Sequence, residues 1–174
     1  MSESDRRLQS LERRVSAMGI RYYAYPVAAD SIEDAKRTPY AHLGGDPLMD
    51  AWGPLEDKPR MLYLDKCWRE LQVLLGETRP ARSLVEGQVV MHADGWDGHT
   101  SVLDPAEVSI IADDLAQVTD DQVSAMIVQN RDAYRHRDVD IDAEVKYVLS
   151  YLHDAQHFTR ALAEDGFGLV YLIG

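Results

Sequence analysis

Cysteine is nearly absent from the sequence, with Cys67 alone among 174 residues. A single cysteine cannot form an internal disulfide, so nothing in the composition indicates a secreted, disulfide-bonded protein. Long apolar runs are missing as well, and none reaches the roughly 18 residues that a membrane-spanning helix requires. The opening residues, MSESDRRLQSLERRVSAMG, contain no apolar core of a signal peptide. We therefore expect a cytoplasmic protein without membrane segments.

Basic residues are scarce, at 18 Lys and Arg against 30 Asp and Glu, which gives a net charge of −12. The stretch from Asp104 to Glu144 holds eleven acidic residues against three arginines, a net of −8. A surface of this sign repels phosphate backbones, which argues against nucleic-acid binding. The stretch is either a solvated face or a docking surface for a basic protein partner. The four carboxylates that we expect to point to solvent there are Asp113, Asp114, Asp120 and Asp121.

The sequence motifs of common catalytic and cofactor sites are also missing. No P-loop, GxGxxG, GxSxG or CxxC pattern occurs in the chain. Serine, histidine and aspartate are plentiful, but no spacing selects a catalytic triad. We therefore expect no cofactor, and no residue can be given a catalytic role.

The first residues that carry a helical pattern are 5–18, where Leu8, Leu11 and Val15 lie on one helical face and several arginines on the rest. Met18 begins the stretch MGIRYYAYPV, which would also serve as a start. Residues 1–17 are therefore either a helical arm or an upstream extension, and residues 18–174 are expected to form one domain.

Ile20 to Val27 is rich in tyrosine and predicts a strand. Residues 28–60 contain four prolines and predict mostly loop, with a helical turn near Ser31 to Lys36. A connection of this length is unusual in a compact domain, and long loops often carry function. Its second part, residues 36–60, is therefore a further candidate for holding a protein partner.

The lone cysteine lies in LDKCWRELQVLLG, residues 64–76, where apolar residues recur at helical spacing and Gly76 is a natural end. The pattern predicts one helix beginning near Leu64, with Asp65 in its first turn. Cys67 lies within the apolar stripe beside Trp68. A buried thiol behaves as a small apolar group and not as a thiolate nucleophile, so we interpret Cys67 as a core residue.

Three more helices are expected from the remaining sequence. Asp104 and Thr119 each precede a capping-box pattern, and a third helix spans about Asp142 to Glu164 before Gly166. The final run, FGLVYLIG, predicts a strand covered on both faces. The expected fold class is α+β, with a small mixed or antiparallel sheet that includes the N- and C-terminal strands and is packed by several amphipathic helices.

Four segments together resemble one family: MGIRYYAYPV, YLDKCWRELQVLLG, SVLDPAEVSIIADDLAQV and YVLSYLHDAQHFTRALAEDGFGLVYLI. They are similar to the YfbM-like family, a bacterial domain of unknown function, over residues 18–174. Where the family often has a Gly-Tyr-Gly-Pro-type turn, this chain has DGWDGHTSVL. The resemblance implies an α+β fold, and it supplies no catalytic residues.

Two clusters have side chains that could bind a metal or a ligand. His153 and His157 are spaced to share one helix face, so they are either a surface pair or a metal site. The sequence around them fits a metal site less well, because the residue after His153 is Asp and not the Glu of HExxH. The stretch HADGWDGH is either a plain turn or a pocket that takes an apolar wall and polar contacts from Asp94, Trp96, Asp97 and His99.

Two functions follow from these observations. The first is a non-catalytic binding or interaction protein that uses the acidic face or the 36–60 loop, with a basic protein as a possible partner. The alternative is a small hydrolase or metal-dependent enzyme with its site around residues 92–99. The missing catalytic constellation favours the first, and the oligomeric state is left open.

Overall fold

The computed structural model describes residues 19–131 and 140–174, so the predicted arm of residues 5–18 lies outside the described residues. The α-helices of the described part are α2 (Ile32–Arg37), α3 (Pro47–Trp52), α4 (Trp68–Leu75), α5 (Pro105–Leu115), α6 (Asp120–Gln129) and α7 (Ile141–Asp165). Its strands are β1 (Tyr22–Val27), β2 (Leu62–Asp65), β3 (Val90–His92), β4 (Gly95–Asp97), β5 (His99–Leu103) and β6 (Gly168–Ile173). None of the helices described is long and apolar enough to cross a membrane.

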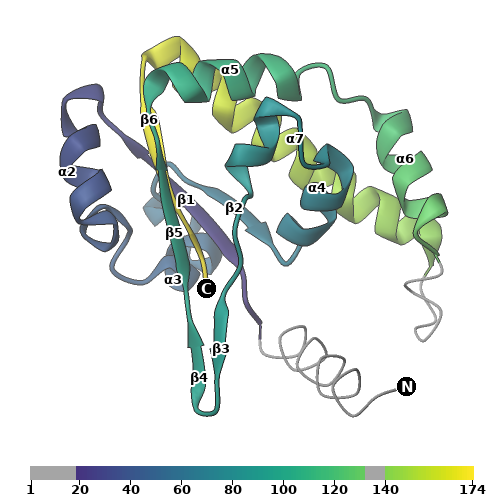
Figure 1. Ribbon diagram of the computed structural model, residues 1–174, viewed down its shortest axis with the longest axis horizontal. Helices are drawn as coiled ribbons and strands as arrows, with labels where there is room; N and C mark the ends of the chain where they lie inside the picture. Colours follow the sequence, from purple (N-terminus) through teal and green to yellow (C-terminus); the bar gives the residue numbers. More distant parts are fainter. Residues whose placement is uncertain (1–18, 132–139) are drawn as a thin grey trace.

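Four of the strands form one sheet in the order β2-β1-β6-β5, and every neighbouring pair is antiparallel. The first and last strands of the chain, β1 and β6, are its two central strands. β3 and β4 form a separate hairpin that extends away from the body of the molecule (Figure 1). The predicted α+β class with an antiparallel sheet is confirmed.

The two faces of the sheet are buried by different elements. Side chains alternate along a strand, so Tyr22 and Ala24 of β1 face the larger core, while Tyr23 and Tyr25 face the smaller one. Helices α4 to α7 pack on the larger core, and α2 contributes to the smaller one (Figure 1). Burial on both faces explains the continuous apolar run of β6 and confirms its prediction.

Helices α5 and α6 begin where the sequence predicts, and α7 ends where it predicts. The Asp104 carboxylate accepts a hydrogen bond from the Glu107 amide at 2.8 Å, and Thr119 caps α6 in the same way through Gln122. Both capping boxes are complete, so the amides of the N-cap residue and of the third helical residue each have a side-chain acceptor at the start of both helices. Gly166 ends α7 in the left-handed conformation, with φ of 71°.

The prediction of one helix beginning near Leu64 is wrong. Leu62 and Leu64 are buried on strand β2, and the helix α4 begins only at Trp68. Leu64 fits the two-residue period of a strand, and it also fits the helical spacing to Trp68 and Leu71. The pattern of apolar residues alone could therefore not distinguish a strand from a helix at this position. Asp65, expected in the first helical turn, instead ends the strand with φ of 49°.

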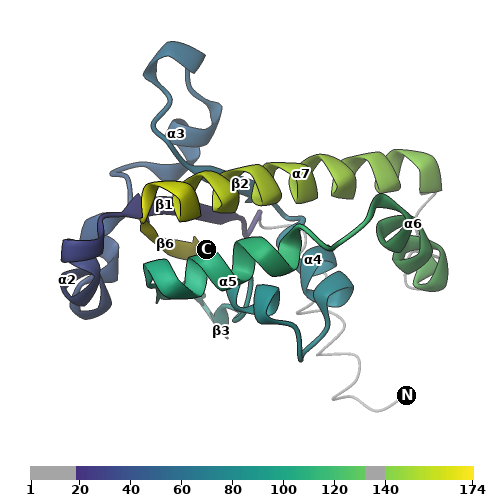
Figure 2. The same ribbon diagram turned by 90° about the horizontal axis from the view of Figure 1, so that it is seen from above.

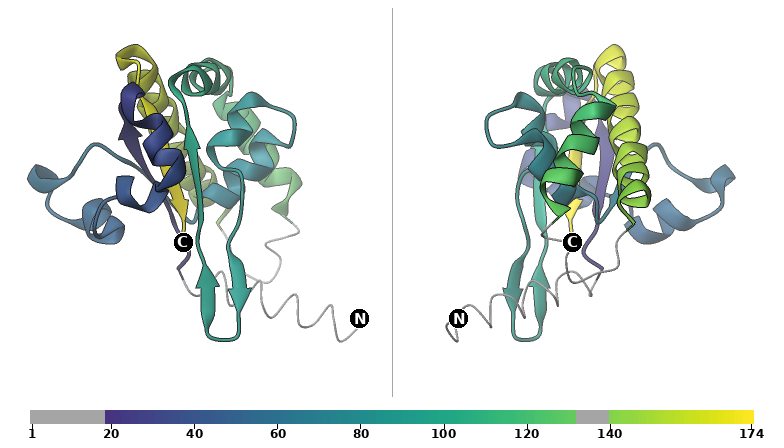
Figure 3. Two further views of the ribbon diagram at one scale, coloured as in Figure 1. Left: turned by 60° about the vertical axis from the view of Figure 1, so that its left-hand side comes forward. Right: turned by 90° about the vertical axis from the view of Figure 1, so that its right-hand side faces the viewer.

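The prediction of mostly loop for residues 28–60 is wrong, because short α- and 3-10 helices make up most of this segment; the expected helical turn is present as α2. The segment also contains α3, which the sequence did not predict, and short 3-10 turns. α3 and the residues after it project from the side of the body, as Figures 2 and 3 show. Apolar side chains remain exposed there, notably Met49, Trp52 and Leu55.

Cys67 should behave as a structural residue in the native protein. Its side chain is fully buried, and burial, with a smaller contribution from the nearby carboxylates of Glu70 and Glu144, raises the pKa of the thiol. We expect a thiol reagent such as DTNB to label the native chain slowly at neutral pH, and the unfolded chain at the rate of a free thiol. Rapid stoichiometric labelling of the native chain would contradict this placement.

Candidate functional site

The predicted 92–99 site is part of the projecting hairpin, where its four candidate residues lie in different surroundings. The segment expected to be a turn or loop contains β3, a tight turn at Ala93 and Asp94, β4 and the start of β5. Asp94 is exposed at the turn, and Trp96 is half-buried against the main core. Asp97 pairs with His92 across the hairpin at 2.7 Å. His99 lies beside the ring of Tyr171.

The two histidines of α7 are both exposed and lie against different neighbours. His153 Nε2 lies 2.9 Å from the Asp120 carboxylate on α6. His157, one turn further along, lines the groove described below. Among residues 19–131 and 140–174, no group of three His, Cys, Asp or Glu side chains gathers at metal-binding distance.

The acidic candidates are less free than the sequence suggested. Asp113 pairs with Arg160 at 3.2 Å, and Asp120 with His153, whereas Asp121 is exposed at the start of α6. Asp114 does not point to solvent. Its carboxylate accepts two hydrogen bonds from Arg79, at 2.9 and 3.2 Å, and one from the Ala81 amide.

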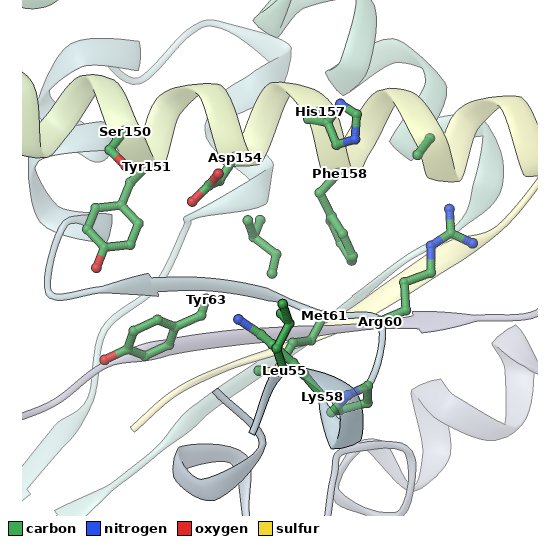
Figure 4. Close-up of a pocket in the computed structure, with 13 residues that line it drawn as sticks. Leu55, Lys58, Arg60, Met61, Tyr63, Ser150, Tyr151, Asp154, His157 and Phe158 are labelled. Carbon is green, nitrogen blue, oxygen red and sulfur yellow. The ribbon is translucent and has the colours of Figure 1, made fainter. Parts of the chain in front are cut away.

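A groove that no sequence motif marked runs between α7 and the edge of the sheet (Figure 4). Its volume is about 820 Å³. One wall is a single face of α7, made by Ser150, Tyr151, Asp154, His157, Phe158 and Ala161. The other wall is the chain from residue 58 to residue 63, which leads into and forms the start of β2, with Leu55 at the rim.

Both ends of this groove are closed by fixed contacts between its walls. At one end the rings of Tyr63 and Tyr151 meet edge to face, with centroids 6.3 Å apart. At the other end Arg60 forms an ion pair with Asp165 at 2.7 Å. Increasing residue number on the strand side therefore corresponds to decreasing number on α7, and the two walls run antiparallel.

The interior of the groove mixes apolar and polar groups. Met61, Leu62 and Phe158 supply apolar surface. Asp154 and Lys58 lie on opposite walls, close enough to influence each other's charge but without an ion pair between them. Burial raises the pKa of the Asp154 carboxyl, and the nearby charge of Lys58 partly offsets the effect. Asp154 is nonetheless exposed to solvent, so its carboxylate is accessible to a cationic or hydrogen-bond-donating group.

Asp65 is the anchor that ties α7 to the edge strand. Its carboxylate accepts hydrogen bonds from the Tyr147 hydroxyl at 2.8 Å, the Tyr63 hydroxyl at 3.0 Å and Arg21 Nε at 3.1 Å. Burial alone would raise the pKa of Asp65, but the two tyrosine hydroxyls, with help from Arg21, lower it below its usual value. Arg21 is itself held under the ring of Trp52, 5.2 Å from its centroid.

The comparisons with known proteins show a family without an assigned activity. A family described as a domain of unknown function, DUF1877, matches residues 18–171. The chain belongs to the DUF1877 family. Its structure is similar to that of YfbM from Escherichia coli, a protein of unknown function, with a TM-score of 0.56 and 16% identity over 89% of this chain and 100% of that one. None of the curated proteins matches.

The resemblance to the YfbM-like family is thus confirmed, and the structural likeness supports the fold alone. It assigns no role to the groove or to the 92–99 hairpin. Sequence reasoning missed the groove because its walls come from segments far apart in the chain. The one signal that pointed toward it was the length of the 28–60 connection, whose last residues form the strand-side wall.

Replacing Asp65 by Asn should destabilise the protein by roughly 1.5–3 kcal/mol, the range for a hydrogen bond to a charged group. Asn tolerates the positive φ at this position as well as Asp does, so the change removes the charge and one acceptor oxygen without straining the backbone. A lowered folded-state pKa stabilises the fold above the unfolded pKa, and this contribution is lost as pH falls through the folded value. The stability difference between wild type and variant, measured in urea, should therefore shrink below about pH 4. A difference that is constant from pH 7 to pH 2 would contradict the anchor.

Asp114 and Asp113 should respond differently to the same substitution. Asp114→Asn removes the charge from a pair with Arg79 in which the Asp114 side chain is only 15% exposed, and should cost roughly 1.5–3 kcal/mol. Asp113→Asn changes a side chain that is 69% exposed and should stay within about 0.5 kcal/mol of wild type. Thermal unfolding of the two variants side by side checks this, and equal midpoints would show that the Arg79 pair does not stabilise the fold.

Proposed function

We propose that this protein is a non-catalytic binding protein that holds a protein partner in the groove between α7 and the edge of the sheet. The observation that supports the proposal is the groove itself, open to solvent, mixed in character and held at fixed width by contacts at both ends. Binding sites commonly combine an apolar lining with a few placed polar groups.

Exposed apolar surface continues from the groove onto the neighbouring segment. Leu55 at its rim is 86% exposed, and Trp52 nearby is 61% exposed. Large apolar side chains gathered at a rim are a common feature of protein interfaces, and aromatic residues are enriched there. This part of the 36–60 loop is also one of the two surfaces that the sequence suggested for a partner, the other being the acidic face.

The proposed partner is basic. The net charge of −12 attracts a cationic protein at long range, and Asp154 offers it a partly desolvated carboxylate inside the groove. Asp113, Asp120 and Asp121 can add to this attraction from α5 and α6, although two of them already have partners within the chain. Asp114 belongs to the fold and is not included.

We also propose that the protein acts in the bacterial cytoplasm. Its buried free thiol is compatible with a reducing compartment, and the similar structure comes from a bacterium. The alternative function is a small hydrolase or metal-dependent enzyme at residues 92–99. There, however, Asp94 lies at the exposed tip of the hairpin while His99 lies at its base, and no contact favours that site over the groove.

The test uses one charge placed at the groove rim and one placed elsewhere. Leu55→Glu should abolish capture of a partner from a cell lysate by the tagged full chain, because it places a carboxylate on the apolar rim. Ile110→Glu, on exposed surface of α5 with 56% exposure, should leave capture unchanged. Both variants should unfold at the wild-type temperature, since neither side chain is buried.

Varying the salt concentration in the same experiment separates the long-range electrostatic attraction of the partner from its short-range contacts with the groove. Raising the ionic strength should slow association with the captured protein, because exposed charges are screened over about 8 Å at physiological ionic strength. Capture that is equal for wild type, Leu55→Glu and Ile110→Glu would overturn the groove as the binding site.

A further inference from the structure

The strand side of the groove is the free edge of the four-stranded sheet. β2 pairs with β1 on one side only, and the groove lies on its other side. Six consecutive residues, 58 to 63, line the groove. Leu62 and Tyr63 are successive residues of β2 with side chains on opposite faces of the sheet, so a groove that both of them line reaches the backbone edge of the strand.

Some backbone groups at this edge form no backbone hydrogen bond with any other described part of the chain. Outside the ladder with β1, no backbone hydrogen bond involves residues 60 to 63 within the described ranges. The first backbone group beyond them that is occupied in this way is the Leu64 carbonyl, which accepts from the Cys67 amide at 2.9 Å. An open edge of this kind is a template for another extended chain.

The lengths of the two walls fit one short strand. The α7 face from Ser150 to Ala161 spans about 16 Å at 1.5 Å per residue. Residues 58 to 63 span up to about 17 Å when extended, and Lys58 has extended dihedral angles. A peptide of about five residues would therefore lie between the edge and the helix along their whole common length.

We propose that the groove binds an extended segment of a basic protein partner, which adds as a fifth strand beside β2 and under α7. This inference rests on the proposed function and specifies how the partner is recognised. The outward backbone groups of residues 60 to 63 hydrogen-bond to the added strand. Side chains on one face of that strand pack on Met61, Leu62 and Phe158, and a Lys or Arg lies against Asp154.

The chemistry of the groove fixes the type of segment that it can hold. Alternate apolar residues are needed, because only one face of the added strand meets the apolar lining. A cation is favoured by Asp154 and by the net charge of the chain. A second copy of this protein fits poorly, since two chains of charge −12 repel each other.

The probe is a random dodecapeptide library displayed on phage and screened against the full chain. Enriched sequences should alternate apolar residues and contain Lys or Arg. The most enriched peptide, made synthetically, should bind Ser150→Trp at least about tenfold more weakly than wild type, because the indole fills the groove. Ser109→Trp is the matched control, an exposed serine on α5, and should bind the peptide within about twofold of wild type.

Strand addition is then separated from side-chain docking by methylating the peptide backbone. One version carries N-methyl groups on its odd-numbered amides and the other on its even-numbered amides. Only one of these sets faces the β2 edge, so one version should lose at least about tenfold in affinity while the other stays within about twofold. Amide hydrogen exchange within residues 60 to 63 should slow when the unmodified peptide binds.

The outcomes distinguish this inference from the proposed function. If Ser150→Trp weakens binding but both methylated peptides bind like the parent, the groove is a binding site and strand addition is wrong. If no peptide is enriched, or if Ser150→Trp and Ser109→Trp bind alike, the groove does not hold a peptide, and the proposed function fails together with this inference.

Discussion

The carboxylate of Asp65 is the contact on which the rest of the candidate site depends. It stands at the end of β2 and accepts hydrogen bonds from Tyr63 on the same strand and Tyr147 on α7. Its hydrogen bonds add to the ring packing of Tyr63 on Tyr151 and to the shared core contacts of β2 and α7. A carboxylate with three donors is a strong, directional tie, and it explains why a residue other than glycine has positive φ here.

The hydrogen bonds to Asp65 hold α7 beside the edge of β2, and the groove lies between the two. Elsewhere the helices lie over the face of the sheet, where side chains fill the space between the layers. α7 also reaches past β2, and its Tyr151 meets Tyr63, which belongs to the opposite face. A helix beside an edge cannot satisfy the strand's backbone groups, because its own are already bonded within the helix. The space along β2 therefore has a wall on each side, while the helix leaves the outward backbone groups of the strand without hydrogen bonds from it.

The sequence predicted the fold well where one periodicity dominated and failed where two overlapped. Capping boxes at Asp104 and Thr119, Gly166 and the apolar run of β6 each report local chemistry, and each prediction was right. Leu64 served both a strand and a helix pattern, so β2 was missed. Because β2 was missed, the groove and the role of Asp65 were missed as well. The edge of a sheet can be identified only when the order of its strands is known. Distant pairings such as Arg79 with Asp114 leave no local pattern, which is why Asp114 was taken for a surface charge.

An open strand edge is a hazard for any protein, because it can pair with the edge of another copy. Three features of this chain restrict what can use it. Pro59 removes one backbone donor at the start of the edge, Lys58 places a charge there, and α7 forms the facing wall along it. The net charge of −12 further separates identical copies. These restraints limit pairing between whole sheets but still admit a narrow extended segment, and the net negative charge that separates identical copies also favours a cationic one.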